Sequence, residues 1–134
     1  MKINEIQNEQ SLDLNRPMFT ISIVADILKV HQRTLRIYDD ENILIPSRSL
    51  KNRRLYSFND IEKGKFIQYL TRNLGINLVG IKIIMYFLSK QGIPLNEHIN
   101  YISKIALELD ISLETQLENR NRLSKRGRKS VNNN

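Results

Sequence analysis

Two short segments of this chain carry its clearest chemistry, residues 31–39 and residues 48–54. If the first segment is helical, Gln32, Arg33 and Arg36 lie on one face of it. Guanidinium and amide groups suit phosphates and the acceptor edges of guanine or adenine. The second segment holds four cations and no acid. Together the two segments predict a surface that touches DNA at two neighbouring places.

The apolar pattern predicts the helices that would position the first segment. Two short helices, over 22–28 and 32–42, are separated by a tight turn, which is typical of a helix-turn-helix. We expect Ser22 to cap the first helix. Leu35 and Tyr38 should face the first helix, together with Thr34, and leave the polar face free.

A hairpin is predicted to hold the second segment. Residues 47–57 alternate as strands do and turn at Lys51-Asn52. Leu55 and Tyr56, with Leu50 as a further candidate, should supply its packing, while the arginines point outward. Residues 18–21 fit a very short additional strand.

Two further helices follow the hairpin. Ser57 or Asn59 should cap a third helix that ends near residue 73, and Asn77 a fourth that ends at Lys90. The fourth helix is apolar on two sides, so something besides its own small domain must cover it. Its two stripes are Leu78, Ile81, Met85 and Leu88, and Val79, Ile83 and Phe87.

A long helix is predicted over 95–123, with the apolar spacing of a coiled coil. A seam of about three heptads is marginal alone in water. We therefore expect it to pair with a second chain rather than fold back as a lid. The seam residues are Ile102, Ile105, Leu109, Leu113 and Leu117.

Composition excludes several classes of function. The chain has no cysteine, so disulfides, thiolate metal sites and thiol redox sensing are excluded. It has two histidines and no clustered nucleophile, base or phosphate loop, so neither a metal site nor an enzyme is expected. No apolar run approaches the roughly 20 residues of a membrane span. No secretory signal is visible at the start, so a cytoplasmic protein is expected.

The net charge of +7 is weaker evidence for nucleic acid than the local cluster. Six of the positive charges follow residue 119 with no acid among them, and the rest of the chain is nearly balanced. A cationic tail can attract many kinds of anion. We expect residues 1–17 to be a flexible leader and residues 124–134 a disordered basic tail.

These segments resemble the DNA-binding region of the MerR family of transcriptional regulators. The family reads Thr-Leu-Arg-x-Tyr-Asp/Glu in its second helix and Arg-Leu-Tyr-Ser in its wing, which here are residues 34–39 and 54–57. The resemblance covers about residues 18–88. His31 and the Asn-Leu-x-Gly-Ile segment at 77–81 look most like the heat-shock-repressor branch. The nitrogen-regulator branch, with its Asn-Arg-Arg wing, is a close second.

The resemblance implies a mainly α fold, a winged helix-turn-helix with a C-terminal dimerisation helix. In the family the second helix enters the major groove and the wing grips the neighbouring backbone. Many members carry an aromatic residue where this chain has Ile37, so the operator preference does not carry over. The residues that the pattern and the resemblance assign to DNA binding are Gln32, Arg33, Thr34, Arg36, Tyr38, Arg48, Lys51, Arg53, Arg54 and Tyr56.

We therefore expect a DNA-binding domain at 18–90 and a dimerisation helix at 95–123, with no cofactor. The expected function is a transcriptional regulator that binds an inverted-repeat operator in double-stranded DNA as a homodimer. The heat-shock resemblance implies a repressor of stress genes with an Hsp70-type chaperone as a co-repressor. The alternatives are a nitrogen-regulator-like member or an accessory DNA-binding protein with little sequence preference.

Overall fold

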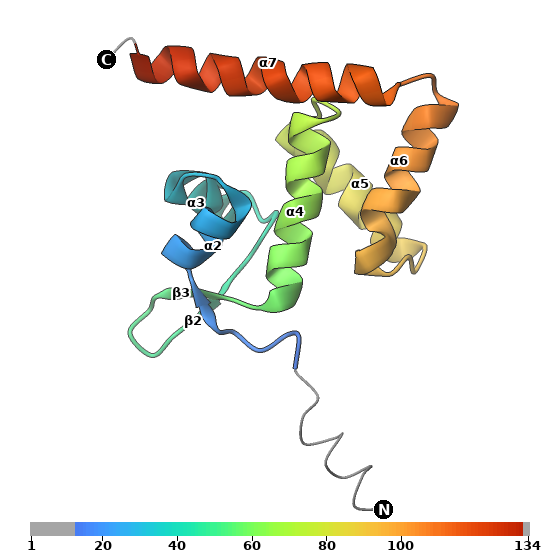
Figure 1. The fold of residues 1–134 in the computed structure, drawn as a ribbon. Helices are drawn as coiled ribbons and strands as arrows, with labels where there is room; N and C mark the ends of the chain where they lie inside the picture. Colours follow the sequence, from blue (N-terminus) through green and yellow to red (C-terminus); the bar gives the residue numbers. More distant parts are fainter. Residues whose placement is uncertain (1–12, 133–134) are drawn as a thin grey trace, which may run out of the picture.

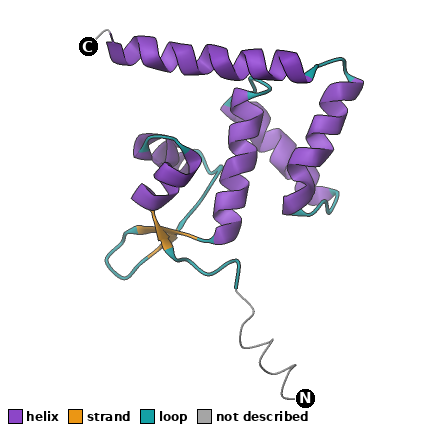
Figure 2. Cartoon of the chain, viewed as in Figure 1, coloured by secondary structure: helices purple, strands orange, loops and turns teal. Residues whose placement is uncertain are grey.

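The computed structural model describes residues 13–132, and from residue 123 onward its backbone alone. The part described is mainly helical, as expected (Figure 2). None of its helices is long and apolar enough to cross a membrane. The elements in chain order are β1 (Phe19–Thr20), α2 (Ile21–Leu28), α3 (Gln32–Asp40), β2 (Ser47–Arg48), β3 (Arg54–Tyr56), α4 (Phe58–Arg72), α5 (Leu78–Lys90), the 3-10 turn η1 (Leu95–Glu97), α6 (His98–Glu108) and α7 (Leu113–Asn132).

Helix α4 stands between the two halves of the fold, with α2 and α3 on one side and α5 and α6 on the other (Figure 1). Its Phe66, Ile67 and Leu70 are almost fully buried in the shared core. Helix α2 approaches α4 closely at Gly64, where an added Cβ would lie 2.6 Å from Leu28 Cδ1. An alanine at this crossing would therefore require the Leu28 side chain to shift.

Side-chain caps begin α4 and α5, as predicted. The Ser57 hydroxyl accepts from the Asp60 N–H at 3.1 Å, and the Asp60 carboxylate accepts from the Ser57 N–H at 2.9 Å. The Asn77 side chain accepts from the Gly80 N–H at 2.9 Å. These caps satisfy N–H groups that a helix start leaves without partners.

Helix α2 begins earlier than predicted. Thr20 occupies the N-cap position and Ser22 lies inside the first turn, so the cap assigned to Ser22 was wrong. The reason is that β1 ends at Thr20 and Ile21 already packs against the core. The two hydroxyls lie 3.2 Å apart.

A three-stranded antiparallel sheet of order β1-β3-β2 builds the predicted hairpin. Strand β3 pairs Tyr56 with Phe19 of β1 and Arg54 with Arg48 of β2. The hairpin turns over residues 49–52, and Asn52 adopts a φ of 61°. Leu50 is fully exposed in this turn, so the packing role predicted for it was wrong.

The two apolar stripes predicted on α5 are both present. Ile81 and Leu88 are buried in the core, and Leu78 and Met85 pack at its edge. The second stripe faces solvent: Val79, Ile83 and Phe87 are 64%, 64% and 57% exposed.

The prediction of a single helix over 95–123 was wrong. A turn at residues 109–112 separates α6 from α7, with Asp110 at a φ of 63°. Ser112 then starts α7 by accepting from the Thr115 N–H at 3.1 Å. The predicted seam is divided accordingly. Ile102 and Ile105 are half-buried on α6, whereas the exposed leucines are Leu109, Leu113 and Leu117.

The predicted flexible leader and disordered tail are each described in part. The leader is held at its last residues, since Leu14 accepts from the Asn59 N–H at 3.0 Å and Asn15 from the Asn59 amide at 2.7 Å. The backbone of α7 is helical as far as residue 132, and the disordered tail predicted for residues 124–134 stays a prediction. Residues 1–12 and 133–134 lie outside the described residues.

Candidate nucleic-acid interface

Helix α3 divides into a buried face and a polar face, as the helical wheel predicted. Leu35 is fully buried, and Tyr38 nearly so. Arg33 and Arg36 are exposed on the other side. The guanidinium of Arg36 donates to the Gln32 amide oxygen at 3.2 Å, which links two polar groups one turn apart. Three hydrogen-bonding side chains therefore project together from the first two turns of the helix.

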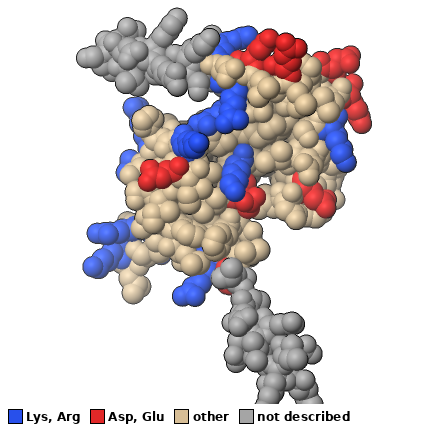
Figure 3. Space-filling view, viewed as in Figure 1, with Lys and Arg blue, Asp and Glu red and all other residues tan. Residues whose placement is uncertain are grey.

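The hairpin brings the second cationic segment beside this face. Lysine and arginine side chains gather over the hairpin at the lower left of Figure 3. An open hollow of about 440 Å³ is lined by Gln32 of α3 and by Arg48, Arg53 and Arg54 of the hairpin. The predicted juxtaposition of the two segments is thus confirmed, while their contact with DNA stays a prediction.

Two of the hairpin arginines share one carboxylate. Asp39 Oδ2 accepts from Arg54 Nε at 2.9 Å and from Arg48 Nη2 at 3.2 Å. Arg48 Nη1 also donates to the backbone oxygen of Asn52 in the turn, at 3.3 Å. No local pattern signals this arrangement, because Asp39 and Arg54 are fifteen positions apart.

The two tyrosines assigned to DNA binding belong to the core. Tyr56 is 0% exposed, and its buried hydroxyl has no hydrogen-bond partner among the described residues. Burial raises the pKa of Tyr56 to about 12, against the opposing effect of Arg54. Burial also raises the pKa of Tyr38. Both side chains therefore pack in the core, and the DNA contacts assigned to Tyr38 and Tyr56 stay predictions.

Other residues lie at the turn between α2 and α3, beside this interface. His31 occupies the N-cap position of α3, but its side chain makes no capping hydrogen bond. Arg72 of α4 donates to the Lys29 carbonyl at 2.9 Å, which ties α4 to the turn between α2 and α3. Lys29 lies in the left-handed region with a φ of 56°. Sequence reasoning missed Arg72, since nothing local marks it as a partner of that turn.

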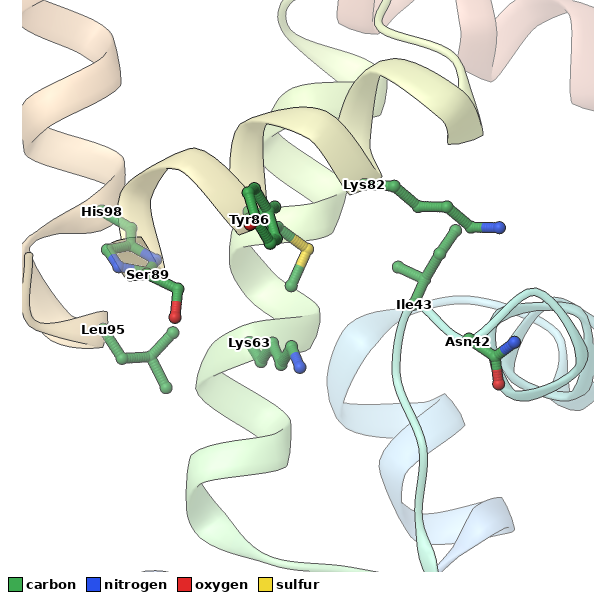
Figure 4. A pocket seen from close by; sticks show the side chains of 9 residues that line it. Asn42, Ile43, Lys63, Lys82, Tyr86, Ser89, Leu95 and His98 are labelled. Atoms are coloured by element: carbon green, nitrogen blue, oxygen red, sulfur yellow. The ribbon is translucent and has the colours of Figure 1, made fainter. Parts of the chain in front are cut away.

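A separate hollow of about 560 Å³ lies between α4, α5 and the segment after α3 (Figure 4). Its wall is largely apolar, from Ile43, Met85 and Leu95, with Lys63 and Lys82 at its side. Lys82 is 3.5 Å from Glu41, so its charge already has a partner. The hollow shares no residue with the hairpin surface. It therefore belongs to the packing of α5 rather than to the reading surface, the polar surface formed by α3 and the hairpin.

A helix-turn-helix, a hairpin wing against its second helix and a helix pair behind them define a winged helix-turn-helix protein. Residues 19–88, just over half of the chain, match the MerR HTH family of regulatory proteins. The chain belongs to the MerR family and is a DNA-binding transcriptional regulator.

Two kinds of relative show how far the likeness extends. HTH-type transcriptional regulators GlnR of Bacillus anthracis and Bacillus cereus are 36% identical over 102 residues, which cover 75% of this chain and 78% of theirs. The heat shock protein HspR of Streptomyces coelicolor is 38% identical over 79 residues, covering 59% of this chain and 52% of its own length. Both branches that the sequence resembled are thus represented.

Proposed function

We propose that this regulator binds an inverted-repeat operator as a homodimer, with α3 reading bases and the hairpin holding the backbone. The observation that carries the proposal is that Gln32, which accepts from Arg36, lines one hollow with the hairpin cations Arg48, Arg53 and Arg54. An α-helix fits the major groove of B-DNA, where arginine can donate to two acceptors of guanine and glutamine can pair with one donor and one acceptor of adenine. Phosphate contacts by the hairpin would fix the register of the helix.

The two parts of the surface differ in what their charges can do. Arg33 and Arg36 project from α3 and are exposed, so they are free to reach base edges. Lys51 and Arg53 are exposed on the hairpin and suit phosphates. Gln32 and Thr34 are half-buried at the start of α3, where they can assist but not reach far. Affinity should therefore come from both parts, and base choice mainly from α3.

Dimerisation is supported by apolar surface that one chain leaves uncovered. Leu113 and Leu117 lie one turn apart on α7 and are 64% and 56% exposed, and Leu109 beside them is 67% exposed. The exposed stripe of α5 adds three more large apolar side chains. Exposed apolar patches rimmed by polar residues mark interaction sites in soluble proteins. A second copy that pairs α7 with α7 would cover the leucines and present two α3 helices to DNA.

The proposed function is tested by substituting one base-reading residue and one matched cation. Duplexes are first selected from a random pool with the full chain, and affinities are then measured by fluorescence anisotropy. Arg36→Ala should weaken binding to the selected duplex by about 10-fold to 100-fold, since a bidentate base contact is worth roughly 1–3 kcal/mol. Lys104→Ala removes an exposed cation from α6, across α4 from α3, and should change affinity less than about threefold. Equal effects of the two substitutions would show that α3 does not read the sequence.

The target genes and partner remain proposals that rest on relatives alone. The likeness to HspR supports repression of stress genes in the cytoplasm, with an Hsp70-type chaperone as co-repressor. The longer match to GlnR favours a regulator of the second branch just as well. Footprinting on genomic DNA would identify the operators, and reporter assays with and without the gene would give the sign of regulation. Recovery of no chaperone in a native pull-down would count against the co-repressor.

A further inference from the structure

The carboxylate of Asp39 lies where elementary electrostatics disfavours it. It belongs to the last turn of α3, where the helix dipole repels negative charge. Asp40 and Glu41 follow it directly. It also lies at the edge of a surface proposed to approach phosphates. A negative charge at such a place weakens DNA binding unless it serves another purpose.

The neighbouring strands supply that purpose. Arg48 and Arg54 are directly opposite each other in the β2–β3 pairing. Like charges at opposed positions destabilise a strand pair. One oxygen of Asp39 accepts from both guanidinium groups, at 3.2 and 2.9 Å, and so compensates the repulsion. Its side chain is 15% exposed and that of Arg54 21%, so water screens this pair only in part.

The same carboxylate joins three elements that would otherwise move separately. It belongs to α3, and its two partners belong to β2 and β3. Through the Arg48 bond to the Asn52 carbonyl, the connection reaches the turn of the hairpin. The base-reading helix and the hairpin are thereby held at one fixed distance and angle.

We infer that Asp39 is a positioning residue that sets the hairpin against α3, and that it contributes sequence selectivity at a cost in overall affinity for DNA. Helix α3 and the hairpin then meet DNA in one register only. A correct sequence allows both to make their DNA contacts, and an incorrect sequence allows neither to make them fully. Without the carboxylate, the freed arginines would hold phosphates of any sequence. This inference rests on the proposed function, because it assumes that α3 reads bases.

The neighbouring acid provides a matched comparison. Asp39→Asn and Asp40→Asn remove the same charge from adjacent positions of one helix end, and Asp40 is exposed with no ion pair among the described residues. Affinity is measured for a duplex selected with the wild-type chain and for a scrambled duplex of equal length. If charge alone matters, both variants bind both duplexes more tightly by the same factor. If Asp39 positions the hairpin, Asp39→Asn binds the scrambled duplex as well or better and the selected duplex less well.

We expect the ratio of the two affinities to fall about tenfold in Asp39→Asn, equivalent to about 1.4 kcal/mol of discrimination, and to stay within about twofold in Asp40→Asn. An unchanged ratio in Asp39→Asn would overturn the inference while leaving the proposed function intact. A wild-type chain that prefers neither duplex would overturn the proposed function and this inference with it.

A second variant keeps the test decisive if Asp39→Asn does not fold. Arg48→Gln leaves the Asp39–Arg54 pair in place and removes only the strand β2 partner. If Arg48 only binds phosphate, Arg48→Gln should lose affinity equally for both duplexes and show a smaller salt dependence. If Arg48 positions the hairpin, the variant should lose more affinity for the selected duplex than for the scrambled one. Equal losses on the two duplexes in Arg48→Gln would count against the inference.

Discussion

At the scale of single residues, the motif locates the functional region but not the direction of each side chain. Arg36 and Tyr56 both belong to segments that resemble the MerR pattern, yet one is exposed and the other is 0% exposed. The polar face of α3 follows from helical periodicity, which the sequence displays. The packing of Tyr56 was predicted with the hairpin, but its pairing with Phe19 of β1, thirty-seven positions earlier in the chain, was not. A contact of that kind leaves no local signal in the sequence.

Tyr56→Phe tests whether this tyrosine packs or binds DNA. Its hydroxyl is buried with no hydrogen-bond partner in the described part of the chain, which costs free energy, so removing it should leave stability unchanged or raise it by up to about 1 kcal/mol. Affinity for the selected duplex should stay within about twofold of the wild type, since the side chain does not reach the surface. Urea unfolding and anisotropy measure the two quantities. A large loss of affinity with normal stability would restore the DNA contact.

The same variant should change how stability depends on pH. The pKa of Tyr56 is about 12 in the folded chain and about 10 in the unfolded chain, so the folded state keeps a proton that the unfolded state loses between these values. Stability contributed by Tyr56 is therefore complete below pH 10. It falls by about 1.4 kcal/mol per pH unit above pH 10. Tyr56→Phe should fall less steeply between pH 10 and 12, and a slope equal to that of the wild type would contradict the assignment.

At the scale of elements, the sequence predicts helices whose ends carry their own chemistry. Ser57 and Asn77 mark the starts of α4 and α5, because the side chain of each accepts from the backbone N–H three residues later. The break between α6 and α7 could not be predicted in this way, because apolar residues continue at helical spacing through Ile105, Leu109 and Leu113. The break arises where Asp110 takes a left-handed conformation and where α7 turns to dock on α4, which is a tertiary contact.

Gln116 should be the principal anchor of α7 on α4. It is 2% exposed, accepts from the Tyr69 hydroxyl at 3.0 Å and donates to the Ile111 carbonyl at 3.3 Å. Gln116→Ala leaves both groups without partners, so the free energy of unfolding should fall by about 1–3 kcal/mol. Glu118→Ala alters an exposed side chain of the same helix and should cost less than about 0.5 kcal/mol. Urea denaturation of both variants decides whether α7 is part of the cooperative fold, and equal small losses would show that it is not.

At the scale of the whole molecule, the reading surface and the uncovered apolar surface lie on different parts of the fold. The hairpin and α3 occupy one side of α4, while α5 and α6 lie on the other and α7 crosses its end (Figure 1). A second chain could therefore cover the exposed leucines without blocking α3. The anchor of α7 on α4 would then fix the distance between the two α3 helices of a dimer, which is the quantity that an inverted repeat encodes.

Leu113→Asp combined with Leu117→Asp tests this division of labour. Both side chains are more than half exposed in one chain, so the charges should not disturb the fold but should prevent two copies from pairing. Sedimentation velocity at micromolar concentration should give a dimer for the wild type and a monomer for the variant. Ile45→Asp, at a residue 58% exposed in the loop after α3, should remain a dimer.

On DNA, the wild type should prefer a full inverted repeat over a single half-site by about 100-fold or more, because the second half-site is bound at high effective concentration. The variant should bind both duplexes alike. A wild-type monomer, or a variant that keeps the preference for the full repeat, would show that the dimer is not built through α7.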